Sequence, residues 1–224
     1  MIYAAKIYTI ILRMVQRGFI HLAHCGGSEL RDTIEEHVPD QIFVHHLNPK
    51  LWVKEGRPPE DKLIRYWKYG GGYRADNTKP VTDLCDRLCT VVRDPYTRVR
   101  KEMRSSGIDH TDPLGHDIMC KSLLVAFTGD IRVYLEPFTE SKYDMMWKHI
   151  NDTNTLVGVL DKYPQFITKL NEHFGVNFIA GNFDKVLTQY PDDLRKTIER
   201  YNHFDLMLYT KAAHLNMDDL QCKK

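Results

Sequence analysis

The sequence predicts an α/β fold with a central, largely parallel sheet flanked by helices. Short apolar runs alternate along the chain with longer amphipathic stretches, and this alternation is typical of repeated βα units. The chain has 224 residues, of which 42% are hydrophobic and 27% charged, so it has enough apolar material for a core. We therefore expect one domain over residues 1–224.

Four apolar runs are predicted to form the strands, and Leu88–Val92 is the strongest of them. The others are Gly18–Ala23, Ile42–Val44 and Leu156–Val159.

Helix periodicity and capping residues predict the helices between and after these strands. Leu30, Ile34 and Val38 recur at i, i+4 and i+8, and Pro39 ends that helix. Asp94 as N-cap and Pro95 at the first position begin another helix, which runs to Ser105-Ser106-Gly107. Further helices are expected at Gly115–Phe127, at Glu140–Ile150, at Phe166–Phe174 with Gly175 as C-cap, from Pro191, and around Phe204–Ala212.

The charge balance and the cysteines exclude several classes of protein. There are 31 basic and 30 acidic residues, a formal charge of +1, so a histone-like protein or a strongly acidic partner is not expected. The five cysteines form no CxxC pair and fit neither a disulfide scaffold nor a cysteine-rich zinc site. We expect reduced thiols.

The N-terminal segment is apolar but too short to span a membrane. Lys6 and Arg13 leave Ile7–Leu12 as its longest uninterrupted run, whereas a membrane span needs about 20 residues. No small-residue cleavage site follows. We expect a packed helix or strand without a transmembrane segment; an interfacial anchor or the remnant of a trimmed targeting segment are the alternatives.

The stretch Lys50–Lys79 is basic and rich in aromatic residues. Aromatic faces beside cations suit a sugar or an anionic polysaccharide, and equally suit single-stranded nucleic acid. We expect a solvated loop region with buried aromatic anchors instead, and Tyr69–Tyr73, with three consecutive glycines, as its most flexible point.

A glycine pair lies between the first predicted strand and the first predicted helix, in FIHLAHCGGSEL (Phe19–Leu30). Gly26 and Gly27 let backbone N–H groups close around an anion, and the helix N-terminus adds partial positive charge. This pattern indicates a phosphate-type ligand; a tight turn without a ligand is the alternative. A Walker A loop demands a lysine after its second glycine, and none is present, which disfavours an ATP-dependent kinase.

A second candidate anion site follows the strongest predicted strand. Arg93 comes at the carboxyl end of Leu88–Val92, where ligands bind in open α/β sheets, and its paired donors suit a phosphate. The helix that begins at Asp94-Pro95 is expected to add backbone donors. The alternative is a salt bridge between Arg93 or Arg98 and a neighbouring carboxylate.

Together these segments resemble the PAPS-dependent sulfotransferases, specifically the carbohydrate sulfotransferases of the Golgi. In that family a strand ending in a phrase like FIHIPKTGGTS binds the 5′-phosphosulfate, and one ending in RDPxxRxxS binds the 3′-phosphate; Phe19–Ser28 and Arg93–Lys101 are the counterparts here. Leu156–Gly175 resembles the family's VGxxERxxxxxxxLxxxFG stretch, and Tyr201–Tyr209 resembles its NxxDxxLY helix.

The resemblance implies a single P-loop-like domain that moves a sulfuryl group from PAPS to a hydroxyl, on a carbohydrate acceptor, without a metal and without a nucleic-acid partner. Family members are tethered in the Golgi lumen, so a trimmed family member and a cytoplasmic outlier both stay open. The cofactor contacts that it implies are His24, Cys25, Gly26, Gly27 and Ser28 in the first loop, and Arg93 and Lys101 at the 3′-phosphate.

Two positions depart from the family pattern. Lys101 stands where the family has a serine, and an ammonium meets a 3′-phosphate as well as a hydroxyl does. His24 stands where the family has the lysine that contacts the bridging oxygen and the sulfonate. An imidazole, with an ordinary pKa of about 6.5, supplies that cation only in part at neutral pH unless the bound phosphates favour its charged form. A catalytically inactive relative that binds through the same pocket or the basic aromatic stretch is the alternative.

The acceptor hydroxyl needs a catalytic base, for which the family uses a histidine or a glutamate. His45 and His46 follow Ile42–Val44 and are expected at the same sheet edge as the first loop. Either of them can point inward, since adjacent strand residues face opposite sides; a surface or capping pair is the alternative, and Glu29 and Glu35 are weaker candidates. The eleven histidines form no HxxxH or HxH pattern, so no metal site is expected.

Overall fold

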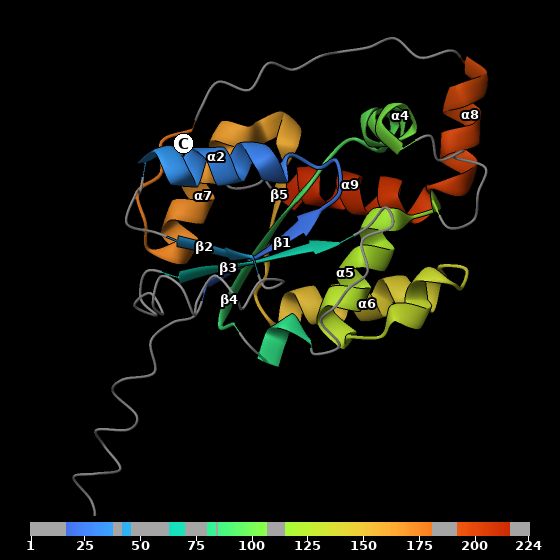
Figure 1. The fold of residues 1–224 in the computed structure, drawn as a ribbon. Coiled ribbons are helices and arrows are strands. Elements are labelled where there is room, and N and C mark those ends of the chain that lie inside the picture. The colour runs from blue at the N-terminus through green and yellow to red at the C-terminus, as the bar shows by residue number, and fades with distance from the viewer. Residues whose placement is uncertain are drawn as a thin grey trace, which may run out of the picture.

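A parallel sheet forms the centre of the computed structural model, which describes residues 17–37, 42–45, 63–69, 80–83, 85–106, 115–180 and 192–215. Its five strands lie in the order β2-β3-β1-β4-β5, and every neighbouring pair is parallel (Figure 1). This confirms the α/β prediction. The strands are β1 (Arg17–Leu22), β2 (Ile42–His45), β3 (Leu63–Tyr69), β4 (Arg87–Val92) and β5 (Leu156–Val159).

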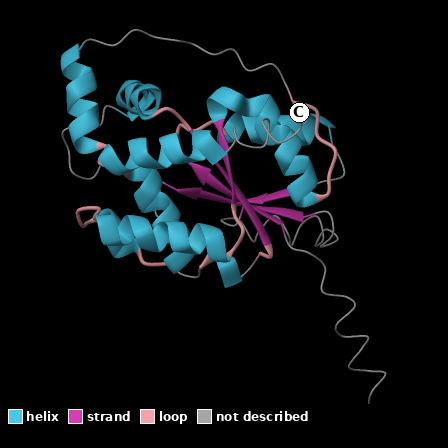
Figure 2. Cartoon of the chain, turned by 180° about the vertical axis from the view of Figure 1, so that it is seen from behind, coloured by secondary structure: helices cyan, strands magenta, loops and turns pink. Residues whose placement is uncertain are grey.

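Helices cover both faces of the sheet (Figure 2), and those expected from the sequence are present. No helix within the described part of the chain is long and apolar enough to cross a membrane. The helices are α2 (Gly27–His37), α4 (Pro95–Ser106), α5 (Ile118–Thr128), α6 (Glu140–Asp152), α7 (Tyr163–Phe174), α8 (Asp192–Tyr201) and α9 (His203–Leu215), with 3-10 turns η2 (Val81–Asp83), η4 (Ile131–Tyr134) and η5 (Leu160–Lys162).

The strands divide their side chains between two cores because successive residues face opposite sides of a sheet. Ile20 and Leu22 of β1 pack with α5, α6 and α9 in the larger core. Phe19 of β1 and Val91 of β4 pack with α2 and α7 in the smaller one. This burial on both faces explains why the strands read as continuous apolar runs.

Helix ends follow the predicted capping chemistry at two places. The Asp94 carboxylate accepts hydrogen bonds from the backbone N–H and the hydroxyl of Thr97, at 3.0 and 2.7 Å, as an N-cap residue of α4 does. Gly175 ends α7 with φ 65°, a left-handed conformation that favours glycine.

The N-termini of α5 and α9 are capped by each other's carboxylates. Asp117 accepts from the backbone N–H groups of Phe204 and Asp205, at 2.8 and 3.1 Å. Asp205 accepts in return from those of Met119 and Cys120, at 3.1 and 2.9 Å. Burial and the nearby Asp205 charge raise the pKa of Asp117 to about 7, and burial raises the pKa of Asp205.

The strand β3 corrects the prediction that all of Lys50–Lys79 is a loop region. Residues Leu63–Tyr69 (LIRYWKY) pair with both β1 and β2, between which β3 lies. Isoleucine, tyrosine and tryptophan are strong β formers, and the interspersed Arg65 and Lys68 concealed this preference. Three predicted regions lie outside the described residues: the N-terminal segment 1–16, the rest of Lys50–Lys79, and Pro191.

Candidate anion-binding site

The candidate site lies where the carboxyl ends of β1 and β4 meet. From β1 the chain first adds β2 and β3 toward one edge of the sheet, and it later adds β4 and β5 toward the opposite edge. Neighbouring strands whose connections diverge in this way leave a crevice at their carboxyl ends, where open α/β sheets bind ligands. Both segments that the sequence singled out, the β1–α2 loop and the β4–α4 turn, follow the carboxyl ends of these two paired strands, where such a crevice is expected.

The β1–α2 loop is a tight turn with two residues in the left-handed region. His24 has φ 61° and Gly26 has φ 86°. The Gly26 carbonyl accepts the first helical hydrogen bond, from Leu30 N–H at 3.2 Å, which makes Gly26 the N-cap of α2. The N–H groups of the first turn, from Gly27 to Glu29, have no acceptor within a helix and point out of its N-terminus. An anion at this end is favoured by the donors and by the helix dipole.

Packing requires glycine at both positions of the pair. A β-carbon on Gly27 would lie 1.9 Å from Cδ2 of His21, and one on Gly26 would lie 2.3 Å from Cδ1 of Leu160. The His21 ring is buried and stacks on Phe19 with ring centroids 5.8 Å apart. His21 therefore fixes the start of α2, a role that no local sequence pattern indicates.

Cys25 contributes to the core rather than to an anion contact. Its backbone N–H donates to the Leu22 carbonyl at 3.2 Å, and its thiol lies 3.4 Å from the Ala23 carbonyl. Burial raises the pKa of the Cys25 thiol to about 12, so it is neutral. Of the predicted loop contacts, the backbone groups of Gly26, Gly27 and Ser28 therefore remain the best donors.

Arg93 links the two candidate segments. One of its terminal guanidinium nitrogens donates to the His24 carbonyl at 3.3 Å. The backbone donors that the sequence led us to expect at the start of α4 are used in part, because the Asp94 carboxylate caps Thr97 N–H there. The second anion site consequently depends on the Arg93 side chain more than on the α4 backbone.

Arg98 forms a salt bridge with neighbouring carboxylates, which was the alternative to an anion contact. Its side chain is fully buried, with Nη1 2.7 Å from Glu102 Oε2 and Nη2 3.7 Å from Asp205 Oδ2. Nη2 also donates to Asn202 Oδ1 at 3.1 Å. We call Arg98, Glu102, Asn202 and Asp205 the buried ion cluster. It joins α4 to the α8–α9 corner, and its charges act on the neighbouring Cys25 thiol of the loop.

One contact places the C-terminal half of α4 beside the loop. Ser105 Oγ lies 3.3 Å from Nε2 of His24. Lys101 precedes Ser105 by one helical turn and is exposed. Residues four apart share a helix face, so the Lys101 side chain extends from the face that contacts the loop. No local sequence pattern indicates Ser105, because its contact with His24 joins residues 81 positions apart.

The predicted base candidates are placed only by the backbone. His45 ends β2, and the register β2–β3–β1 sets it level with Phe19, three residues before the end of β1. With β3 in between, the backbone of His45 lies roughly 10 Å to the side of β1 and roughly 10 Å short of its end. His46 lies outside the described residues, so the choice of a base stays a prediction.

A carboxylate and a tyrosine meet where η5 packs against α9. Tyr209 of α9 donates its hydroxyl to Asp161 Oδ2 at 2.6 Å, and Lys162 donates to the Ala213 carbonyl at 3.3 Å. Burial and the Asp161 carboxylate raise the pKa of Tyr209. These bonds hold η5, whose Leu160 covers Gly26, against α9.

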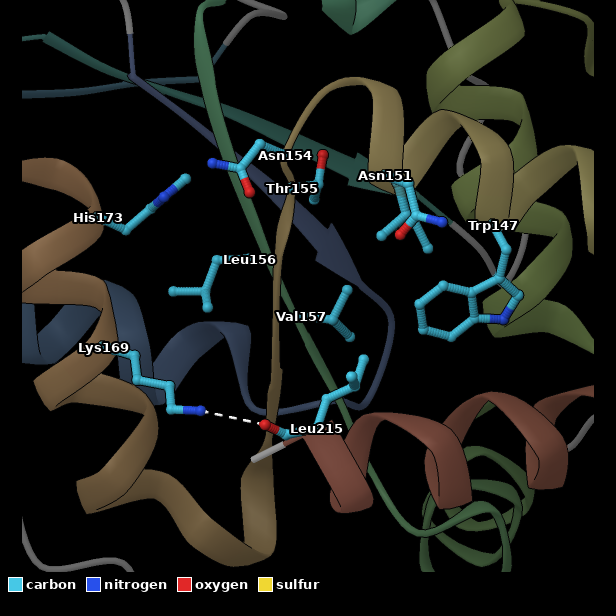
Figure 3. Close-up of a pocket in the computed structure, with 10 residues that line it drawn as sticks. Trp147, Asn151, Asn154, Thr155, Leu156, Val157, Lys169, His173 and Leu215 are labelled. Carbon is cyan, nitrogen blue, oxygen red and sulfur yellow. Dashed lines mark hydrogen bonds between the residues drawn. The ribbon is translucent and has the colours of Figure 1, made fainter. Parts of the chain in front are cut away.

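A separate cavity of about 260 Å³ opens at the amino end of β5, between α6, α7 and α9 (Figure 3). Its basic groups already have partners: Lys169 donates to the Leu215 carbonyl at 3.2 Å, and His173 lies 3.0 Å from the Leu88 carbonyl. Burial lowers the pKa of His173. This cavity is therefore a poor candidate for an anion site, and it lies at the end of β5 remote from the β1–α2 loop.

Neither a scan against protein-family models nor a search of curated proteins gives a match for this chain. Among the described residues, no group of three or more His, Cys, Asp or Glu side chains is arranged to hold a metal ion. The four cysteines within the described residues, Cys25, Cys85, Cys89 and Cys120, are buried and form no disulfide.

Proposed function

We propose that this protein is a PAPS-dependent sulfotransferase, with a P-loop-like site at the carboxyl ends of β1 and β4, that transfers a sulfuryl group to a hydroxyl of a carbohydrate. The observation that carries the proposal is the hydrogen bond from Arg93 to the His24 carbonyl, because it joins the two segments of the family-like pattern at one crevice. PAPS carries two separate anionic groups and needs two such sites.

Each anionic group has suitable donors on its own strand end. The N-terminus of α2 offers the backbone N–H groups of Gly27 and Ser28 to the 5′-phosphosulfate. Arg93 and Lys101 offer two cations to the 3′-phosphate, from the turn before α4 and from the middle of α4. Sulfuryl transfer requires in-line positioning and stabilisation of the charge that moves onto the leaving group, and these donors serve both needs.

Calorimetric titration with PAP, the desulfated product, tests the proposal. We expect wild-type protein to bind PAP and the Arg93→Ala variant to bind it roughly 10- to 150-fold more weakly, the effect of a lost charge-assisted hydrogen bond. Arg104→Ala is the matched control, since Arg104 is an exposed arginine of the same helix. Absence of wild-type binding, or equal losses in both variants, would refute the proposal.

A catalytically inactive binding protein is the second candidate, and the residue that favours it is His24. Its ring contacts Ser105, so the position of the family's lysine holds a shorter side chain that is already engaged. An acceptor screen with PAPS and the variant His24→Lys separates the two functions. The sulfotransferase proposal expects turnover by the wild type, and His24→Lys to retain or raise it. Turnover only in the variant would establish the binding protein.

A further inference from the structure

The turn η5 joins the two helical layers at the carboxyl end of β5. Leu160 is buried in the smaller core, with α2 and α7. The next two residues bind α9, which packs in the larger core. Asp161 accepts a hydrogen bond from the Tyr209 hydroxyl at 2.6 Å. Lys162 donates to the Ala213 carbonyl at 3.3 Å. η5 therefore ties α9 to the layer that contains α2, although the two helices cover opposite faces of the sheet.

Leu160 lies directly against the β1–α2 loop. Its Cδ1 and Cδ2 atoms are 2.3 and 2.9 Å from the position that a β-carbon on Gly26 would occupy, so this side chain fills the space beside the glycine. Gly26 is the N-cap of α2 and has φ 86°, and the donors of the first helical turn follow it. Because glycine has wide conformational freedom, a shift of Leu160 would let Gly26 turn and would redirect those N–H groups.

Tyr209 supplies a polar contact that keeps η5 in place. Its ring is half-buried, and burial together with the Asp161 and Asp94 carboxylates raises the pKa of Tyr209, so the hydroxyl stays protonated and donates. A hydrogen bond to a carboxylate is stronger than one between neutral groups. Asp205 lies one helical turn before Tyr209 on α9, and its Oδ2 is 3.7 Å from Nη2 of Arg98 on α4. The same stripe of α9 therefore holds both η5 and α4.

We propose that Tyr209 and Asp161 are positioning residues of the anion site, whose hydrogen bond holds Leu160 against Gly26 and so keeps the N–H groups of the β1–α2 loop directed at one bound anion. The inference rests on the proposed function for the identity of that anion, the 5′-phosphosulfate of PAPS. Because the same stripe of α9 is bonded to α4, it also sets the distance between the loop and the proposed 3′-phosphate contacts.

Backbone amide spectra of the full chain without ligand test the positioning role. Tyr209→Phe removes only the hydroxyl, and we expect it to shift the amide signals of the β1–α2 loop, as Asp161→Ala should. Asp161→Asn keeps an oxygen acceptor for the hydroxyl and should restore signals close to those of the wild type. Tyr134→Phe is the matched control, because the Tyr134 hydroxyl donates to Ser122 Oγ at 3.0 Å and not to η5. Unchanged loop signals in Tyr209→Phe would overturn the positioning role.

Calorimetric titration with PAP tests the ligand role. We expect Tyr209→Phe to weaken PAP binding roughly 2- to 10-fold, the effect of one lost hydrogen bond, and Tyr134→Phe to leave it unchanged. Adenosine 3′-phosphate lacks the 5′-phosphate, so its binding should be the same in Tyr209→Phe and in the wild type. Equal PAP affinity in these two proteins would refute the ligand role. Absence of wild-type PAP binding would refute the proposed function and the ligand role together, whereas the positioning role depends on the amide signals alone.

Discussion

Replacing Arg98 by methionine is the most informative test of how the site is supported. Arg98 is fully buried, and its guanidinium lies 2.7 Å from the Glu102 carboxylate and 3.7 Å from that of Asp205. Asp205 keeps its two backbone donors on α5 in the variant, whereas Glu102 loses the cation that lies one helical turn away on α4. Two buried carboxylates would then be left without the guanidinium.

Removing one partner of a buried ion pair costs about 3–5 kcal/mol of folding free energy. For a chain of this length that corresponds to a fall of roughly 6–20 °C in Tm. The loss should shrink as the pH falls, because burial raises the pKa of Asp205 and Arg98 holds it down. Without Arg98 the folded state binds a proton at Asp205 more readily, and protonation relieves the buried charge.

Urea denaturation of Arg98→Met at pH 7.5 and pH 5.5 measures both effects. Arg104→Met is the matched control, because Arg104 is exposed on the same helix and its replacement should change stability by no more than about 0.5 kcal/mol. A loss of less than about 1 kcal/mol for Arg98→Met at pH 7.5, or a loss that grows at low pH, would refute the reasoning from the buried ion cluster.

Two further substitutions test the loop and the exchanged caps. Gly27→Ala places a β-carbon 1.9 Å from the His21 ring, so we expect a loss of about 1–3 kcal/mol in thermal denaturation together with weaker PAP binding; a variant as stable as the wild type would contradict the tight packing. The pKa of Asp117, raised from 3.8 to about 7, means that this group stabilises the fold most below pH 4, and that the stabilisation is lost as the pH rises through 7. Urea midpoints between pH 5.5 and 8.5 should fall for the wild type and fall less for Asp117→Asn, which keeps an oxygen acceptor for Phe204 N–H; parallel curves would contradict this assignment.

The sequence was sufficient to predict most elements that bury an apolar face. The strands β1, β4 and β5 and the helices α4, α6, α7 and α9 appear close to their expected bounds, because apolar periodicity and capping residues such as Asp94 and Gly175 act over a few neighbouring positions. The strand β3 was missed because its pattern mixes charged with aromatic residues, and its partners β1 and β2 are distant in sequence.

In the candidate site, too, the sequence predicts some features and only the tertiary structure shows the others. The sequence alone was enough to place a glycine turn after one strand and an arginine after another, since both depend on local residue types at the ends of apolar runs. It left open whether Arg93 or Arg98 forms a salt bridge, and the tertiary structure decided for Arg98. The reason is burial: Arg98 points into the contact between α4 and α9, where only a paired cation is tolerated, whereas Arg93 lies at the crevice.

Contacts between distant segments determined side-chain roles that no local sequence pattern indicates. His21 against Gly27, Leu160 over Gly26 and Ser105 against His24 all depend on how the elements pack around the sheet. The exchange of caps between Asp117 and Asp205 likewise needs two helices to meet end to end. Gly26 and Leu160, for example, are more than 100 positions apart in the chain. Such residues come into contact only because the order of the strands brings their elements together.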